Sequence, residues 1–531
     1  MMLRKWCPKY KLRLYLLVLP LILLQKMSSI LHFGMRRTLS FLTFVVGLTL
    51  IVPPQHTASA AGIVGNGTPG SCTEAALNSA LAGGGYVSFN CGANPHTITV
   101  TSQKVLSANT VVDGGNLITL SGGGKSRVFY TNSLVQLTLR NLTIANGYSA
   151  EDGGGVFSGY RGKLIVINCI FNNNKSVKPG EAGGGAIYSK GESTIIVDKS
   201  TFTGNEASLG GAIYDLLSDL TVSNSTFTNN TAGIVAPGGA GGAIYNDGAN
   251  GNTGKIILRG NTFTNNTATN QGGAFFNQLY NSNSTTIENN TFSGNKVTGT
   301  GSQGFGGAIF VVGGTTTAPT YSGGIDNTLF TVRNTTFSNN ISFNQGGGLW
   351  TGNNIRADII NSTFYGNKAA SPDGIGGLGG AIMRTSGKMN LTNVTVANNF
   401  AGFIGGGIVG GNSEVTLRNT IIANNNAANG GNTWNIKQNC SDEMINGGNN
   451  IQFPAKNPND TSDKNCAAGI RIVNPMLGEL ANNGGATPTV PLLTGSPAIN
   501  TGNNATCMMS DQRGVARPQG SACDIGAFEA K

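Results

Sequence analysis

Residues that could do chemistry are scarce in this sequence, because only 11% of its 531 residues are charged and three are histidines. Clustered carboxylates beside a basic residue can bind calcium and remove a proton from a polysaccharide. The nearest approaches to such a cluster are Glu151 and Asp152 with Arg161, and Asp215, Asp219 and Asp247. Acids on solvated loops are the favoured interpretation, since no Ser-His-Asp set, phosphate loop or HExxH motif is present. We predict no catalytic residue, no metal site and no cofactor.

Two further polar features have simple structural interpretations. His96 is the one histidine beyond residue 60, and we expect it at the surface. Charges gather again near the C-terminus, at Asp511, Arg513, Asp524 and Glu529. Salt bridges that hold the chain end are favoured there over a catalytic role.

A column of aromatic residues is the candidate binding site. Gly-Gly motifs such as GGAIY (210–214 and 241–245) recur, and an aromatic residue follows the aliphatic one. If the aliphatic residue points inward, strand alternation turns the ring outward. Rings about 4.8 Å apart on successive coils would form a strip for sugar stacking, unless loops cover it. The candidate ligand-binding residues are Tyr188, Tyr214, Tyr245, Phe276, Phe310 and Trp350.

A repeat of 25 to 45 residues must position this column. Its central apolar residue has an aliphatic residue five positions earlier, and Asn usually stands three positions before and after it. Short strands of period 2, without a helical pattern between them, predict an all-β parallel β-helix (solenoid) of roughly twelve coils. The central residues are Ile144, Phe171, Phe202, Phe227, Phe263, Phe292, Phe337, Phe364, Val396 and Ile422.

Stacked coils explain the abundance of Phe and Asn. Like residues then lie above one another, so a Phe column fills the bore and Asn side chains hydrogen-bond along the axis. Asn also accepts unusual backbone angles at turns. Several of these residues, such as Asn224, Asn334 and Asn361, lie in N-x-S/T sequons. We expect a buried ladder there in preference to glycan attachment.

The cysteines predict three local disulfides, which lie near the two ends of the solenoid. Cys169 is expected to be a free buried thiol, and disulfides indicate an oxidising compartment. TEAALNSALA after Cys72 is expected to be a short helix that covers the open edge of the first coil. The expected pairs are Cys72 with Cys91, Cys440 with Cys466, and Cys507 with Cys523.

The first sixty residues have the pattern of an export signal. Arg36 and Arg37 precede an apolar run and the small residues Ala58-Ser59-Ala60, which is the plan of a secretory signal peptide. We expect Met35 to be the true start. Eight of the 34 basic residues and none of the 24 acidic ones lie in this region. The remainder is nearly neutral, so no nucleic-acid partner is indicated, and no membrane span is expected in the mature chain.

Two stretches resemble known families. GGA-[IL] alternating with F-x-x-N resembles the polymorphic outer-membrane-protein repeat over about 140–428, which implies a right-handed parallel β-helix of the pectin-lyase-like superfamily. NPMLGELANNGGATPTVPLLTGSPAIN (474–500) and DQRGVARPQGSACDIGAFE (511–529) resemble the C-terminal region of choice-of-anchor Q secreted proteins. That resemblance implies export and brings no agreed activity. Free secretion is expected, because the chain ends two residues beyond the motif.

These observations predict five regions and one function. The regions are an extended leader (1–34), a signal peptide (35–60), an N-terminal cap (61–98), β-helix repeats (99–428), and C-terminal coils with a disulfide-linked cap (429–531). We expect a secreted or cell-surface monomer that binds or adheres without catalysis, with glycans as the candidate partner. The alternative is a polysaccharide lyase or glycoside hydrolase of the pectin-lyase-like fold.

Overall fold

The structure is a computed structural model that describes residues 60–180, 182–301, 303–313, 328–353, 355–410, 412–432, 438–460 and 462–531. The predicted leader and signal peptide lie outside the described residues, apart from Ala60. In the part of the chain that is described, no helix is long and apolar enough to span a membrane.

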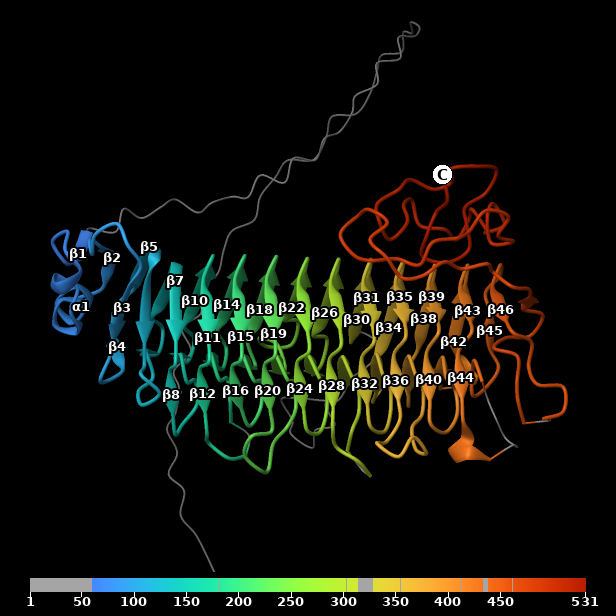
Figure 1. The fold of residues 1–531 in the computed structure, drawn as a ribbon, viewed down its shortest axis with the longest axis horizontal. Coiled ribbons are helices and arrows are strands. Elements are labelled where there is room, and N and C mark those ends of the chain that lie inside the picture. Colours follow the sequence, from blue (N-terminus) through green and yellow to red (C-terminus); the bar gives the residue numbers. More distant parts are fainter. Residues whose placement is uncertain are drawn as a thin grey trace, which may run out of the picture. The chain divides into compact units, whose positions relative to one another are not determined.

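The described chain is a parallel β-solenoid of about 13 turns, which confirms the predicted all-β fold class (Figure 1). A typical turn contains β17 (Ile213–Leu216), β18 (Asp219–Ser223), β19 (Thr226–Thr228) and β20 (Thr231–Ala232). Each strand pairs in parallel with its counterpart one turn later, in β21 (Ile244–Asp247), β22 (Lys255–Arg259), β23 (Thr262–Thr264) and β24 (Thr267–Ala268). Identical positions of the repeat therefore stack along the axis.

Three sheets run the length of the solenoid. The 11-stranded sheet contains the Gly-Gly motifs and consists of β4 (Lys104–Leu106), β6 (Phe129–Thr131), β9 (Val156–Ser158), β13 (Ile187–Lys190), β17, β21, β25 (Phe275–Leu279), β29 (Ile309–Gly313), β33 (Leu349–Gly352), β37 (Ile382–Arg384) and β41 (Ile408–Val409). The 10-stranded sheet consists of β8 (Tyr148–Ser149), β12 (Lys175–Ser176), β16 (Glu206–Ala207), β20, β24, β28 (Lys296–Val297), β32 (Ile341–Ser342), β36 (Lys368–Ala369), β40 (Phe400–Ala401) and β44 (Asn426–Ala427).

The third sheet has 26 strands and begins with β1 (Ala60–Val64), β2 (Gly85–Phe89), β3 (His96–Thr99), β5 (Thr110–Ser121) and β7 (Gln136–Ala145). It then continues as two files. One file is β10 (Lys163–Ile167), β14 (Thr194–Asp198), β18, β22, β26 (Ser284–Glu288), β30 (Leu329–Arg333), β34 (Arg356–Ile360), β38 (Met389–Thr392), β42 (Asn412–Arg418) and β45 (Met444–Asn446). The other is β11 (Ile170–Asn172), β15 (Thr201–Thr203), β19, β23, β27 (Thr291–Ser293), β31 (Thr336–Ser338), β35 (Thr363–Tyr365), β39 (Thr395–Ala397), β43 (Ile421–Ala423), β46 (Ile451–Phe453) and β47 (Arg471–Ile472).

The bore is filled as the repeat predicts. The central Phe residues are fully buried, and each ring lies nearly parallel to the next, with centroids 4.5–5.2 Å apart. Parallel pairing in register produces this stack, because it places Phe directly over Phe.

The two Asn columns have different roles, which corrects one expectation. The asparagines after the central residue form a buried ladder: Asn266 donates to the carbonyl of Phe227 and to the side chain of Asn295, both at 2.9 Å. The asparagines before it, such as Asn224 (φ 49°), adopt left-handed backbone at the bend between two strands. Asn224 is exposed and Asn334 is partly exposed, so the buried ladder expected at these two sequons was wrong. Asn361 is buried, but it donates to the carbonyl of Ser510 in the C-terminal segment.

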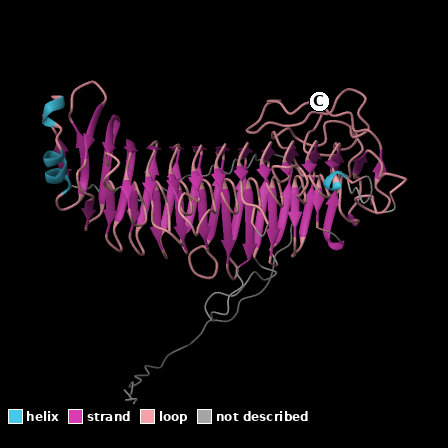
Figure 2. Ribbon diagram, turned by 60° about the horizontal axis from the view of Figure 1, so that its bottom comes forward, coloured by secondary structure: helices cyan, strands magenta, loops and turns pink. Residues whose placement is uncertain are grey.

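The two ends of the solenoid are protected differently. Helix α1 (Glu74–Leu81) buries Leu77, Ala80 and Leu81 beside β1 and β2, and a short 3-10 helix (Pro69–Ser71) precedes it. The C-terminal segment beyond β47 has almost no regular structure and folds back along the flank of the last turns instead of across their end (Figure 2). A second 3-10 helix (Asn429–Gly431) follows β44.

All three expected disulfides are present, which confirms their prediction. The Cα–Cα distances are 5.6 Å for Cys72–Cys91, 5.3 Å for Cys440–Cys466 and 6.6 Å for Cys507–Cys523. Cys169 is free and buried, as expected.

Candidate functional site

The aromatic column forms a continuous ladder on the 11-stranded sheet. Its six residues occupy equivalent positions of β13, β17, β21, β25, β29 and β33, with successive ring centroids 4.3–5.3 Å apart. The preceding residues, such as Ile213 and Ile244, belong to the core in the bore, whereas the rings form a separate cluster. The rings therefore point away from the bore, as strand alternation predicts.

The expected exposed strip for sugar stacking is nevertheless wrong. Tyr188, Tyr214, Phe276, Phe310 and Trp350 are each no more than 8% exposed. The rings stack face to face along the axis, so each ring covers the faces of its neighbours. Stacking of a sugar needs a free ring face, and only ring edges are left outside the stack. The sequence predicted the position of the rings but not the plane in which they lie.

Tyr245 is the exception in this ladder, because it alone of the six is partly exposed. A second column, which precedes each Gly-Gly motif, packs over the rings. After Gly183, its members are Leu209, Ala240, Gln271, Phe305, Gln345, Leu378 and Ile404. Ala240 has the smallest side chain of these and leaves a space above the ladder.

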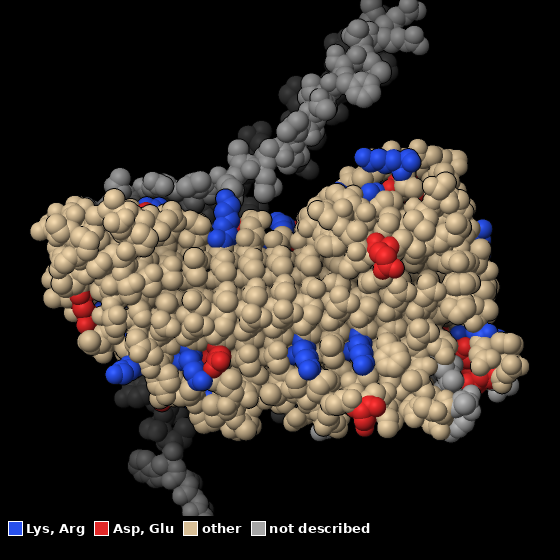
Figure 3. Space-filling model, viewed as in Figure 1, with Lys and Arg blue, Asp and Glu red and all other residues tan. Residues whose placement is uncertain are grey.

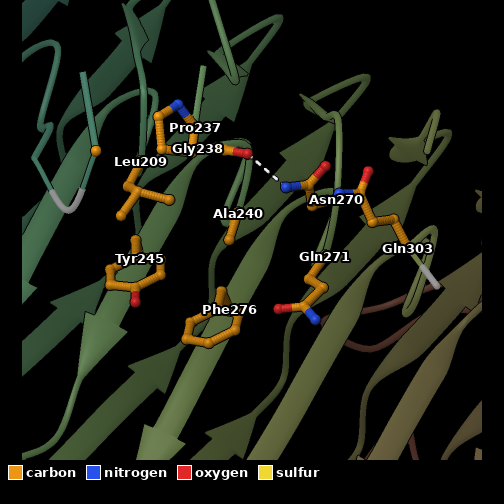
Figure 4. A pocket seen from close by; sticks show the side chains of 10 residues that line it. Leu209, Pro237, Gly238, Ala240, Tyr245, Asn270, Gln271, Phe276 and Gln303 are labelled. Carbon is orange, nitrogen blue, oxygen red and sulfur yellow. Dashed lines mark hydrogen bonds between the residues drawn. The ribbon is translucent and has the colours of Figure 1, made fainter. Parts of the chain in front are cut away.

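That space is a hollow of about 490 Å³ with Tyr245 and Phe276 at its floor (Figure 4). The insertion between Phe227 and Phe263 supplies Pro237 and Gly238 to its wall. Asn270 holds this wall by donating its side-chain amide to the carbonyl of Gly238 at 2.5 Å. Figure 4 shows Gln271 and Gln303 on the opposite side.

The lining of the hollow suits a neutral ligand. Among the described residues, it consists of aromatic rings, small apolar groups and three side-chain amides, from Asn270, Gln271 and Gln303, without a carboxylate or a cation. Amides donate and accept hydrogen bonds at once, which matches hydroxyl and amide groups.

The structure does not bring the carboxylates that were considered for catalysis or calcium binding together with Arg161 in one site. Glu151 and Asp152 pair with Lys178 at 3.0 and 3.1 Å, and Arg161 pairs with Glu192 at 2.6 Å. Among the described residues, no group of three or more His, Cys, Asp or Glu side chains could hold a metal ion.

Asp215 and Asp247 point to opposite sides of their sheet. Asp215 is fully buried in the bore, where Asn246 donates to it at 2.8 Å, while Asp247 accepts from Tyr280 at 2.7 Å. Burial raises the pKa of the Asp215 carboxyl well above its usual value. They form no joint site.

The remaining polar candidates have structural roles. His96 is partly buried, with Nε2 3.2 Å from the carbonyl of Cys72. Near the C-terminus, Arg513 pairs with Asp511 at 2.7 Å and Arg517 pairs with Glu529 at 3.2 Å, and all four side chains are buried. The salt-bridged interpretation of this group is confirmed.

Sequence reasoning missed a second surface. In several repeats the central Phe lies between two threonines, as in TFT (226–228). The repeat pattern explains the Phe and the neighbouring Asn, but it leaves the two threonines without a role. Because the Phe points into the bore, both flanking side chains of β15, β19 and β23 face outward. The signal that could have revealed this surface is the constant Thr on either side of a buried ring.

Known proteins support the fold and little beyond it. Residues 96–325 match the family model described as "Right handed beta helix region". This region is a right-handed β-helix. The finer resemblances to outer-membrane-protein repeats and to choice-of-anchor Q proteins remain resemblances.

Two curated relatives share part of this β-helix. "Metabotropic glutamate receptor-like protein R" of Dictyostelium discoideum is 38% identical over 104 residues, which are 20% of this chain and 6% of that protein. "Probable autotransporter YfaL" of Escherichia coli (strain K12) is 29% identical over 185 residues, 32% of this chain and 14% of the relative. The chain thus spans only a small part of either relative.

Among solved structures, the comparison finds PfbA, described as a surface adhesin of Streptococcus pneumoniae. The TM-score is 0.35 at 13% sequence identity, over 76% of this chain and 95% of that one.

Proposed function

We propose that this chain is an exported, non-catalytic binding protein that acts at a cell surface or outside the cell, and that glycans are its partners. The observation that carries the proposal is the composition of the hollow at Tyr245 and Phe276: aromatic carbon on the floor, amides on the rim and no charge. Amide groups donate and accept hydrogen bonds at once, as sugar hydroxyls require, so this rim favours an uncharged sugar unit held by hydrogen bonds and not by ring stacking.

Three disulfides support an oxidising compartment, and hence export. The printed name of the E. coli relative, a probable autotransporter, is compatible with an exported β-helix. We propose a monomer in this role, with release and attachment both compatible with the same site. A lyase or hydrolase would need a carboxylate beside the bound sugar, and no observation favours that alternative.

The proposal is tested on a glycan array with the exported protein, scoring both retention and cleavage. Replacing Ala240 by Leu, the residue of the same column one turn earlier, fills the hollow from above. We expect Ala240→Leu to abolish retention while the unfolding midpoint changes little. Ile404→Leu, at the far end of the same column, is the matched control and should bind as the native protein does.

Two results would overturn the proposal: retention that is unchanged in Ala240→Leu, or absence of retention on every neutral glycan. Cleavage of any array polysaccharide would instead support the enzymatic alternative.

A further inference from the structure

Two parallel ranks of hydroxyl side chains cover one face of the solenoid. They come from β15, β19, β23 and β27, which pair in register, so each residue lies about 4.8 Å from its counterpart in the next turn. Within a strand the two ranks are about 6.6 Å apart, the distance of two residues. We call this surface the threonine face: Thr201, Thr226, Thr262 and Thr291 in one rank, and Thr203, Thr228, Thr264 and Ser293 in the other.

The threonine hydroxyls of this face have no partner among the residues that the structure describes. Thr262 is exposed and the other members are partly exposed. In the described chain, Ser293 bonds to Ser338, whereas none of the seven threonine hydroxyls makes a hydrogen bond to another protein group. These seven hydroxyls are thus available to solvent or to a ligand.

The threonine face carries no charge. Lys and Glu side chains occur lower on the solenoid, along the 10-stranded sheet, and Figure 3 shows the band above them free of Lys, Arg, Asp and Glu. An ionic partner is therefore not favoured there.

The support beneath the hydroxyls is rigid. Thr is β-branched, which restricts its χ1 angle and fixes its hydroxyl and methyl positions. Directly beneath lie the stacked rings of Phe202, Phe227, Phe263 and Phe292, and the Asn ladder bounds the strands on one side. The spacing of the array is thus set by the core, not by mobile side chains.

The same ranks of threonines continue under the C-terminal segment, where their hydroxyls make hydrogen bonds to that segment. Thr336 donates to the carbonyl of Pro488 at 2.5 Å and accepts from the Gln512 amide at 2.8 Å. Thr363 donates to Gln512 at 2.7 Å, and Thr395 accepts the backbone N–H of Ala527 at 3.0 Å. The covered half therefore engages an uncharged partner through hydroxyls that both donate and accept, and the exposed half offers the same groups.

We propose that the exposed threonine face binds the surface of ice. Water molecules in ice form a lattice in which every oxygen both donates and accepts, and their repeat along one axis is close to the strand spacing. Fixed hydroxyls can join such a lattice, while the threonine methyl groups fill its voids. A pyranose chain matches less well, since it advances by more than one strand spacing per sugar and loses register within a few turns.

Partition of the exported protein into slowly growing ice, together with inhibition of ice recrystallisation, tests this proposal. Thr228→Lys places a long cation in the middle of the array, so we expect it to reduce both activities to the level of an unrelated protein. Thr221→Lys, at an outward position of β18, is the matched control and should act as the native protein does. Urea unfolding of both variants should match the native protein, because neither side chain belongs to the core.

The proposal is overturned if the native protein partitions no better than albumin, or if Thr228→Lys retains full activity. Retention on cellulose that Thr228→Lys abolishes, without ice activity, would also overturn it and would assign the face to a polysaccharide. The hollow is separate from this face, so Ala240→Leu should leave ice partition unchanged.

Discussion

Phe227 and Phe263 stack with their ring centroids 4.8 Å apart and their planes 10° apart, although a long insertion separates them in the sequence. The insertion leaves the register of β19 and β23 unchanged, and the rings remain part of one column. The length of a loop between two strands therefore does not affect how the side chains stack in the bore.

The first prediction concerns this Phe column. Phe263→Ala removes a fully buried ring between two others, and we expect a loss of about 3–5 kcal/mol in the free energy of unfolding. Urea unfolding followed by circular dichroism measures it. Tyr365→Ala, an outward position of the equivalent strand β35, should cost far less. A loss of under about 1 kcal/mol for Phe263→Ala would contradict a close-packed bore.

The second prediction separates the two kinds of Asn. Asn266→Ala removes the amide that donates to the carbonyl of Phe227, and it leaves the backbone N–H and the side-chain amide of Asn230 without the oxygen that accepts from them. Each unsatisfied buried group costs about 1–3 kcal/mol. The adjacent Asn265 is exposed with φ 54°, and the equivalent residues in neighbouring turns include Gly204 and Gly294.

Asn265→Gly should therefore change the free energy of unfolding by no more than about 0.5 kcal/mol. Equal losses in the two variants would show that the ladder does not carry the stability assigned to it.

The sequence predicted the solenoid, the Phe stack and the disulfides because each depends on a residue type that recurs at a fixed position of the repeat or on a pair of cysteines close together in the chain. Strand alternation also gave the outward direction of Tyr214 and Tyr245. It could not give their burial, which depends on the ring planes and on the column from Leu209 to Leu378 that packs over them. The hollow was beyond prediction for the same reason, since it results from one small residue, Ala240, among larger neighbours.

The third prediction is a dependence of stability on pH that originates at Asp215. Burial in the bore raises the pKa of this carboxyl, so the folded protein holds its proton at pH values where the unfolded chain has lost it. Stability should therefore fall as pH rises above about 4, the unfolded pKa, until the folded pKa is reached. One oxygen of Asp215 and one of Asn246 lack hydrogen-bond partners, and a proton shared between them would satisfy both.

Asp215→Asn removes this titration and should make the protein more stable than the native one at pH 7, with a flatter pH profile. Asp219→Asn, at a partly exposed position of β18, is the control and should keep the native profile. Urea unfolding between pH 4 and pH 8 measures both. Parallel profiles for Asp215→Asn and the native protein would refute the assignment.

The fourth prediction concerns Cys169. Its side chain is 1% exposed, and burial raises the pKa of its thiol to about 12, so almost no thiolate exists at pH 8. We expect no reaction with a thiol reagent such as DTNB in the folded protein, and one reactive thiol per mature chain after unfolding without a reductant. More than one thiol after unfolding would mean that a disulfide is open, and labelling of the folded protein would mean that the bore opens near Cys169.

The last prediction concerns the C-terminal segment, whose buried pair of Arg517 and Glu529 has both side chains fully covered. Glu529 also accepts the backbone N–H groups of Gln519 and Asp524, each at 2.8 Å. Glu529→Ala therefore leaves one buried cation and two N–H groups unpaired, which should cost the segment about 3–5 kcal/mol.

Because the segment contacts the last turns through side chains such as Thr336 and Thr363, while the Phe stack is intact beneath it, the loss should be local. Hydrogen exchange should show deprotection of residues 474–531 at denaturant concentrations where β15 to β27 stay protected. Met509→Ala, at a side chain of the same segment that is 91% exposed, is the control and should leave this protection unchanged. Simultaneous loss of protection in the solenoid and the segment would show that they unfold as one unit.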